Sequence, residues 1–361
     1  MQAANLLFAI YANNGQFYAG RISAEAREPT ETRRKPVCDM VGVKMEHLAP
    51  IKKSTEKVGE VTEEAAKELG LAPGTAVYGG GGDASLIGVG AGATEVGDTH
   101  IYSGTGWVGT VVEKQTVDTG AMIAAIVGAD PATFNYFAEL ETSNKCVGWV
   151  KDHLALDEIG VFLKKYGNAA DSFEQVEFNM YDYLEEVIDT IPAGSNGVIF
   201  TPWLHGNRCP FEDPNAAGMF FNIRLETGKT ELIRAVVEGI CFHMKWMYER
   251  QGLKVKTSEA VRFCGGGALG ETTCQILADI LQKDVVVVES PQNIGAVGAA
   301  ACIAVGMGLV PSMKDVKKLI PVKTTYHPNK ANKDVYEKNF KVFKNLYKCN
   351  KENFAILNGQ D

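Results

Sequence analysis

The stretch "AVRFCGGGALGETTCQILADILQKDVVVVES", residues 260–290, decides the fold class because it alternates between two kinds of regular structure. It opens as a short apolar strand, continues through a glycine cluster, and then repeats apolar side chains at helical spacing in "ETTCQILADILQ". "VVVVE" is typical of a second strand, and "IGAVGAAACIAVGMG", residues 294–308, of a second helix. This succession predicts parallel strands covered by helices, so we expect an α/β domain in the second half of the chain.

The glycines of this stretch admit three interpretations. Gly265, Gly267 and Gly270 fit the pattern G-x-G-x-x-G between a strand and a helix, and Glu289 follows the next strand, as in a dinucleotide site. The short first strand, and the absence of a further parallel half after the unit, weigh against an NAD-dependent oxidoreductase. The same glycines would let an adenine or ribose lie directly on the backbone of the turn. A purely structural tight turn is the third interpretation.

Length and composition describe an ordinary globular protein. The 361 residues allow two domains, and the net charge of −8 gives no basic surface for nucleic acid. The eight cysteines form no CxxC pair, which favours reduced thiols and a cytoplasmic location. The six histidines show no metal-ligand spacing, and no apolar run approaches the ~18 residues of a membrane helix. We therefore predict neither nucleic acid nor a membrane as a partner.

The middle of the chain predicts strands and then helices. "DTHIYSGTGWVGTVVE" (98–113), "AMIAAIVGA" (121–129) and "TFNYFAEL" (133–140) suggest an antiparallel meander. Residues 230–250 have the spacing of a long amphipathic helix, whose methionine and aromatic residues we assign to the core.

Gly104, Thr105 and Gly106 are expected at the tip of a hairpin in the middle region. Such a tip can present backbone N–H groups and a hydroxyl to a phosphate. The alternative is a plain hairpin turn with no ligand.

A carboxylate also stands among glycines in "YGGGGDASLIGVGAG", residues 78–92. Asp83 follows four consecutive glycines, which indicate that the backbone turns sharply or approaches something closely. One interpretation is that Asp83 is the N-cap of a helix beginning at Ala84. The other is that it presents its carboxylate to a cleft, and the two are compatible.

The order of these features resembles the FGGY family of carbohydrate kinases, particularly its xylulose kinase branch. The resemblance runs from about Glu60 to the C-terminus. It includes "TPWLHGNRCPFEDPNAAGMFF" (201–221), which is similar to the family's P-x-L-x-G-E-R-x-P-x-x-D-P-x-A-R-G segment. It also includes "LIRAVVEGICF" (232–242), the glycine turn with its helix, and the G-A-x-G-A-A helix.

The resemblance implies an actin-like ATPase fold, of the ribonuclease H-like kind, with two lobes around a cleft. Asp83 matches the family's catalytic base, which takes a proton from a sugar hydroxyl as it attacks the γ-phosphate of ATP. Gly104, Thr105 and Gly106 match its second phosphate loop. The adenosine-binding turn is matched by Gly265, Gly266 and Gly267. The implied ligands are ATP or ADP, Mg²⁺ and a sugar, most simply a ketose such as xylulose.

Several positions depart from the family pattern. Ala84 stands where a sugar-binding Gln or Asn is common, and Asn207, Cys209 and Ala217 replace the usual Glu, Thr and Arg. Near the start of the sequence there is no D-x-G-[TS] motif for a first phosphate loop. Substrate identity is therefore open.

These departures predict the domain organisation. Residues 1–95, including "AANLLFA" (3–9), would be a remnant of the sugar-binding first lobe with the Asp83 turn, and residues 96–361 the nucleotide-binding lobe. The chain would be the C-terminal portion of a sugar kinase, inactive alone. Either a dimer or a separate chain supplying the missing lobe would be its protein partner. The alternatives are a noncatalytic nucleotide-binding protein of the same fold and, third, an NAD-dependent enzyme.

Overall fold

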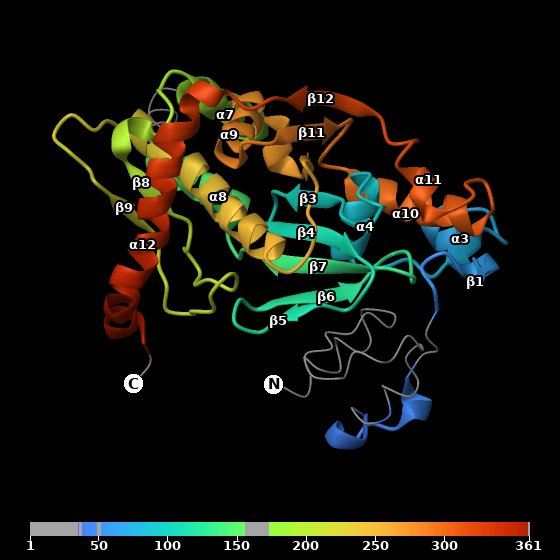
Figure 1. Ribbon diagram of the computed structural model, residues 1–361. Helices are drawn as coiled ribbons and strands as arrows, with labels where there is room; N and C mark the ends of the chain where they lie inside the picture. The colour runs from blue at the N-terminus through green and yellow to red at the C-terminus, as the bar shows by residue number, and fades with distance from the viewer. Residues whose placement is uncertain (1–34, 36–37, 49–51, 156–172, 360–361) are drawn as a thin grey trace.

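The computed structural model describes residues 35, 38–48, 52–155 and 173–359, and a sheet of eight strands lies at its centre (Figure 1). The segment "AANLLFA" lies outside the described residues. Across the sheet the strands follow one another as β12 (Val322–Tyr326), β11 (Asp284–Val288), β10 (Ala260–Cys264), β3 (Thr99–Tyr102), β4 (Trp107–Val112), β7 (Phe134–Glu139), β6 (Ile123–Val127) and β5 (Val117–Asp118).

The parallel part of the sheet confirms the strand–helix succession predicted from the sequence. β10 pairs in parallel with both β11 and β3. Helix α9 (Glu271–Leu281) connects β10 to β11, and helix α10 (Ile294–Gly306) follows β11. The chain is therefore an α/β protein whose glycine cluster joins β10 to α9, as expected.

The antiparallel part differs from a simple meander. All its neighbours are antiparallel, but β7 lies between β4 and β6, so the order in space is not the order in sequence. The prediction of a meander was wrong in this respect. Apolar alternation indicates that a segment is a half-buried strand, but it does not determine which strand it pairs with.

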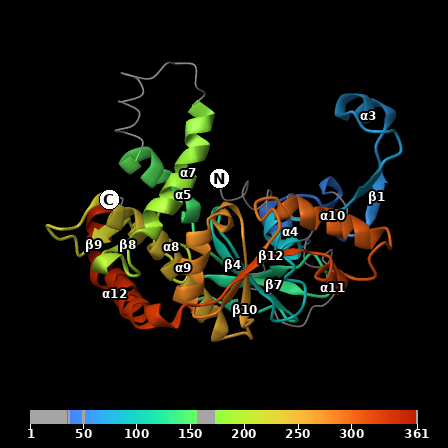
Figure 2. The same ribbon diagram turned by 90° about the horizontal axis from the view of Figure 1, so that it is seen from above.

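Helices cover both faces of the sheet (Figure 2). On one face, Val108 and Phe263 belong to the large core under α8 (Lys229–Gly252), α9 and α12 (Lys333–Asn358). Their chain neighbours Trp107 and Cys264 belong to the core on the other face, with Ile87 and Ile294 from helices α4 and α10. The alternation along each strand thus supplies two apolar layers.

Helix α4 (Asp83–Gly90) lies against α10 through glycines. A Cβ at Gly90 would lie 1.9 Å from the carbonyl oxygen of Ile294, and one at Gly298 would lie 2.0 Å from that of Leu86. No side chain larger than hydrogen fits at these two contacts. The close packing fixes α4 over the sheet, and it thereby fixes the helix start that carries Asp83.

The core beneath α8 is rich in aromatic side chains. Trp203 is fully buried and packs its ring against Phe211, Phe343 and Tyr347. The predicted helix at 230–250 is confirmed, and its methionines 244 and 247 are buried as expected. The short strands β8 (Ile199–Thr201) and β9 (Met219–Phe221) pair beside it.

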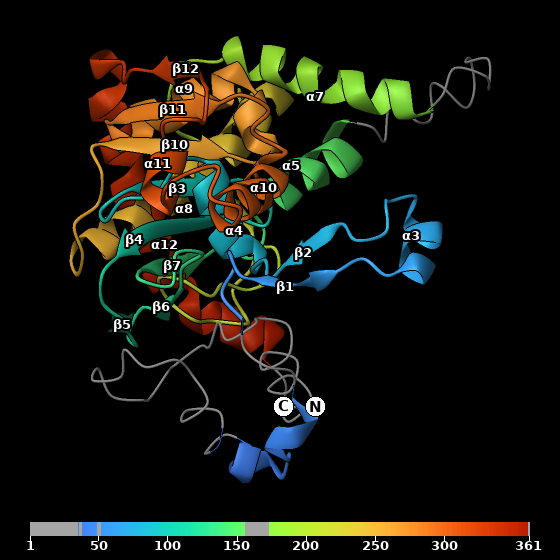
Figure 3. The ribbon, with the colours of Figure 1, turned by 90° about the vertical axis from the view of Figure 1, so that its right-hand side faces the viewer.

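Other elements stand at the edges of the fold. β1 (Lys57–Glu60), α3 (Glu63–Leu69) and β2 (Ala76–Tyr78) form an arm away from the sheet, and α7 (Phe173–Asp189) also extends outward (Figure 3). Gly70 ends α3 in the left-handed conformation. Further short elements are η1 (Met45–His47), α5 (Ser143–Val150), η2 (Lys151–Ala155), η3 (Ser195–Gly197), η4 (Gly266–Leu269), α11 (Met313–Val316) and η5 (Lys330–Asn332).

Within the described residues, no helix combines the length and apolar character needed to cross a bilayer.

Candidate active site

The two glycine turns singled out in the sequence are neighbours, because they follow adjacent parallel strands. Tyr102, the last residue of β3, pairs with Cys264, the last residue of β10. The Ser103 N–H donates to the Cys264 carbonyl (2.8 Å), and the Gly267 N–H donates to the Ser103 carbonyl (3.2 Å). The carboxyl edge of the parallel strands therefore brings both turns to one place, where α/β proteins commonly bind ligands.

The hairpin turn is held through its carbonyl groups. β3 and β4 pair as predicted, with Gly104, Thr105 and Gly106 at the tip and Thr105 exposed. The carbonyls of these three residues accept hydrogen bonds from the N–H groups of Asn144, Ser143 and Leu140 (2.8–3.0 Å). These bonds hold the tip in place, and its N–H groups are the candidate donors to an anion.

The second turn needs glycine for a reason inside the protein. Gly265 has φ +90, and a Cβ there would lie 2.7 Å from the Ser103 carbonyl oxygen. A Cβ at Gly267 would lie 2.4 Å from the Ser103 hydroxyl oxygen. The structural interpretation therefore explains two glycines, whereas Gly266 is exposed at the surface of the turn.

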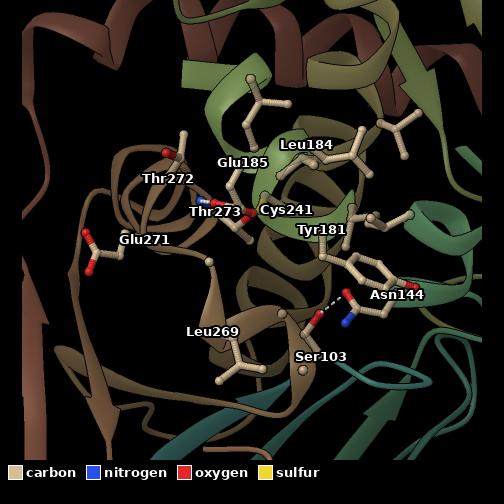
Figure 4. A pocket seen from close by; sticks show the side chains of 18 of the residues that line it. Ser103, Asn144, Tyr181, Leu184, Glu185, Cys241, Leu269, Glu271, Thr272 and Thr273 are labelled. Carbon is tan, nitrogen blue, oxygen red and sulfur yellow. Dashed lines mark hydrogen bonds between the residues drawn. The ribbon is translucent and has the colours of Figure 1, made fainter. Parts of the chain in front are cut away.

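A cavity of about 840 Å³ opens beside these turns (Figure 4). Its polar lining includes Ser103, Asn144 and the backbone of Gly266 and Gly267, and the Ser103 hydroxyl donates to Asn144 Oδ1 (3.0 Å). Its deeper walls are apolar side chains of α5, α7 and α8, including Val236, Ile240, Cys241 and Met244. Acidic side chains also line the cavity: Asp182, Glu185, Glu186, Asp189 and Glu271. Its apolar wall suits a heteroaromatic ring.

Glu185 of α7 was missed by the sequence analysis. Its carboxylate accepts from the Thr273 hydroxyl and from the Thr273 N–H (3.1 Å), and burial raises its pKa. A Cβ at Gly270 would lie 2.2 Å from the Glu185 carboxyl carbon. The third glycine of G-x-G-x-x-G thus makes room for a side chain 88 residues from Thr273 in the sequence. No local pattern marks this contact.

Asp83 lies at the start of α4 and is exposed. The helix begins at Asp83 with Gly82 as its N-cap, so the expectation that Asp83 caps a helix starting at Ala84 was wrong by one residue. Asp83 Oδ1 accepts from the Ala84 N–H (2.8 Å). Asp83 is absent from the lining of the large cavity.

Charged side chains gather near Asp83 at the same sheet edge. Burial raises the pKa of Glu139, at the end of β7, and the charge of Asp83 adds to that rise. Burial likewise raises the pKa of Tyr102, again with a contribution from Asp83. Arg208 forms ion pairs with Glu139 and with Glu141 (Nε–Oε1 2.8 Å). Asp83 is therefore close to the ends of β3 and β7.

Two of the positions that depart from the family pattern, Asn207 and Cys209, are buried. Asn207 is buried, and its Nδ2 donates to the carbonyls of Cys209 (3.0 Å) and Phe211 (2.8 Å). Cys209 is buried, and burial raises its pKa to about 11. Among the described residues there is no group of three or more His, Cys, Asp or Glu side chains able to hold a metal.

The strand-end turns, the adjoining cavity and the exposed helix-start carboxylate define a ligand-binding α/β protein. A family model described as "FGGY family of carbohydrate kinases, C-terminal domain" matches residues 101–307, and the corresponding N-terminal domain model matches residues 34–90. The chain belongs to the FGGY family of carbohydrate kinases.

Individual proteins similar to this chain are kinases of the same kind. A xylulose kinase of Bacillus subtilis is 27% identical over 88% of this chain and 59% of its own length, and an autoinducer-2 kinase of Klebsiella pneumoniae is 27% identical over 87% and 58%. The crystal structure of a ligand-bound xylulose kinase from Lactobacillus acidophilus matches with a TM-score of 0.78 at 22% identity, over 98% of this chain and 68% of that one. The predicted actin-like ATPase fold is confirmed. The chain spans somewhat under two thirds of the length of the curated relatives it matches.

Proposed function

We propose that this chain carries the nucleotide-binding part of an ATP-dependent sugar kinase. The observation that supports this most is the adjacency of the hairpin turn and the β10–α9 turn, because Ser103 of the first and Gly266 and Gly267 of the second line the large cavity, although Gly104, Thr105 and Gly106 do not. A nucleotide needs donors for its phosphates and an apolar slot for its base, and these features adjoin one another here. The sugar is proposed to be a ketose such as xylulose, because a relative of this chain is a xylulose kinase.

The proposed roles follow from chemistry. Gly104, Thr105 and Gly106 would donate N–H groups and a hydroxyl to a phosphate, and Gly265, Gly266 and Gly267 would support the adenosine. Asp83 would accept the proton of the attacking sugar hydroxyl. Its exposure supports this role, because a base must be reachable by the substrate. The nearby side chains of Glu139 and Tyr102 add a carboxyl group and a phenol to this edge of the sheet.

Mg²⁺ is proposed as the counter-ion of the nucleotide phosphates. Mg²⁺ in kinases is commonly held by one or two carboxylates together with phosphates and water, so it needs no cluster of protein ligands. No residue of this chain is assigned as its ligand, because Asp83 is proposed as the base; the ion would neutralise phosphate charge.

We also propose the division of the chain near residue 95. The two family models, which end at 90 and begin at 101, support it. On this division residues 96–361 hold the nucleotide, whereas residues 1–95 supply the Asp83 turn. That the 361-residue chain phosphorylates no sugar alone, and needs a dimer mate or a separate first lobe, stays a prediction. Sugar-dependent ADP release by the purified chain would contradict it.

The second candidate is a noncatalytic nucleotide-binding protein of the same fold. Both candidates predict ADP binding, but they predict different effects of Asp83→Asn on sugar phosphorylation. A kinase form that includes a first lobe should lose about 10²–10⁴-fold in kcat on this substitution, since general-base catalysis contributes about that much. A noncatalytic protein would show no sugar phosphorylation to lose.

Calorimetric titration tests the nucleotide site itself. ADP should bind with saturation and NAD should not, and Gly267→Ala should weaken ADP binding by about tenfold or more, equivalent to about 1.4 kcal/mol. The control is Gly148→Ala, because a Cβ at Gly148 meets nothing within 4 Å. Saturable NAD binding without ADP binding would favour the oxidoreductase instead.

A further inference from the structure

A buried histidine beneath α4 has one ring nitrogen whose chemistry is fixed. His100 of β3 is 1% exposed, and the Trp107 Nε1–H donates to its Nε2 (3.1 Å). Indole nitrogen can only donate, so Nε2 must be the unprotonated acceptor. Burial lowers the pKa of His100 to about 4, so the ring is neutral at pH 7. The ring proton therefore lies on Nδ1.

A buried amide nearby is fixed in the same way. Asn135 of β7 is 5% exposed, and its Nδ2 donates to the carbonyl of Ala84 (3.0 Å), in the first turn of α4. A carbonyl only accepts, so the amide nitrogen must face Ala84 and the oxygen Oδ1 must point the other way. Within the described part of the chain, neither His100 Nδ1 nor Asn135 Oδ1 has a hydrogen-bond partner. One is a donor and the other an acceptor.

Both side chains line the same small cavity. Its volume is about 30 Å³, and Ser85 and Gly88 of α4 also border it. Gly109 keeps space between the two groups: a Cβ there would lie 2.5 Å from His100 Cε1 and 2.6 Å from Asn135 Oδ1. A cavity above roughly 10–15 Å³ can hold a water when polar partners face it.

We propose that this cavity is a binding site for one ordered water molecule, which accepts from His100 Nδ1–H and donates to Asn135 Oδ1. The water completes a chain of hydrogen bonds from Trp107, directly after the hairpin tip, to Ala84, directly after Asp83. His100 and Asn135 are thus positioning residues that tie the hairpin to the start of α4. Their relevance to catalysis rests on the proposed function, but the water site does not.

The test is structural and needs no activity. A crystal structure of the chain, at a resolution that places ordered water, should show one within hydrogen-bond distance of His100 Nδ1 and Asn135 Oδ1. Nitrogen-15 spectra should show His100 protonated at Nδ1 at pH 7. A dry cavity, a direct contact between ring and amide, or an Nε2-protonated His100 would overturn the proposal.

A double-mutant cycle tests the coupling in solution. His100→Phe and Asn135→Leu each leave one partner of the water unpaired, so the loss in Tm of the double variant should be smaller than the sum of the single losses. The matched control is a second cycle that combines His243→Phe with Asn135→Leu. His243 is equally buried but has partners for both ring nitrogens. That pair should be additive. Additivity in the His100 cycle would count against the water bridge.

Discussion

Two buried tryptophan–histidine pairs lie on opposite sides of the sheet, and they complete their hydrogen bonds differently. In the α8 core, Trp203 Nε1–H donates to His243 Nδ1 (3.1 Å), and His243 Nε2 lies 2.7 Å from the Cys209 carbonyl. Under α4, Trp107 donates instead to the Nε2 of His100, and Nδ1 has no partner among the described residues. The two rings therefore carry their protons on opposite nitrogens.

The two sides of the sheet also differ in how their other buried polar groups are paired. The α8 side is a closed aromatic core in which the buried Tyr136 hydroxyl has no partner among the described residues, but both ring nitrogens of His243 are matched within the protein. A further example is Glu238, which is 1% exposed and accepts from Arg234 Nε (2.8 Å) and the Ser195 hydroxyl (2.8 Å). The α4 side lies beneath the Asp83 turn and leaves a complementary donor and acceptor across a small cavity. Tyr136 and Asn207 also carry buried atoms without a partner among the described residues, but they do not line this cavity, so the α4 side is distinguished by a donor and an acceptor that face the same space.

The largest expected effect lies in the closed core. Trp203→Ala should lower the free energy of unfolding by about 3–5 kcal/mol, because it leaves a cavity among packed rings. Urea denaturation at pH 7 measures this loss. Trp246→Ala is the control: Trp246 packs on the same cluster but is only partly buried, so its loss should be smaller. Equal losses would mean that the rings around Trp203 are not a closed core.

Acid should affect both pairs alike, which tests the claim that each histidine is neutral. Burial lowers the pKa of His243 and of His100 from 6.5 to about 4. As the pH falls from 6.5 toward 4, the unfolded chain takes up a proton on each ring before the folded chain does. Stability therefore falls in this window, by up to roughly 3 kcal/mol for each ring.

The measurement is the free energy of unfolding at pH 7 and pH 5 for the wild type, His243→Phe and His100→Phe. Each variant should lose less stability between the two pH values than the wild type, because one proton-binding ring is gone. Groups present in all three proteins cancel in the comparison. The same loss in a variant as in the wild type would show that folding does not lower the pKa of the replaced ring.

Much of the fold was predictable because its signals are local. The β10–α9–β11–α10 succession, the helix at 230–250 and the hairpin around Thr105 each follow from apolar spacing with glycine turns between the elements. The adjacency of the two glycine turns follows in turn, because both follow strands that pair in parallel.

The remaining features depend on contacts that no local pattern records. β7 lies between β4 and β6, and the sequence did not predict this because the strands of this region have similar apolar patterns. Glu185 and Arg208 enter the site from elements far along the chain, and only the packed structure shows that Gly270 exists to accommodate Glu185. Asp83 was singled out from the sequence because four glycines precede it, but the sequence did not predict that it is the first residue of the helix.

A smaller effect should come from filling the space between His100 and Asn135. Gly109→Ala places a methyl group within 2.6 Å of both side chains, so it should destabilise the fold by about 1–3 kcal/mol, as overpacking does. Thermal and urea unfolding measure it. Gly148→Ala is the matched control in open space on helix α5, where alanine should instead stabilise by about 0.5–1 kcal/mol. A neutral Gly109→Ala would show that the two groups move apart freely.

The smallest expected effect on stability is that of Asp83→Asn, and its small size is informative. Asp83 is exposed in the first turn of α4, where a negative charge favours the helix by about 0.3–1 kcal/mol. Glu63→Gln, in the first turn of the exposed helix α3, is the matched control and should cost a similar amount. Unfolding in urea compares the two. If Asp83→Asn costs no more than Glu63→Gln, the carboxylate is not needed to build α4, and any loss of sugar phosphorylation on that substitution reports chemistry. A loss of several kcal/mol would instead make Asp83 a structural residue and weaken its assignment as the base.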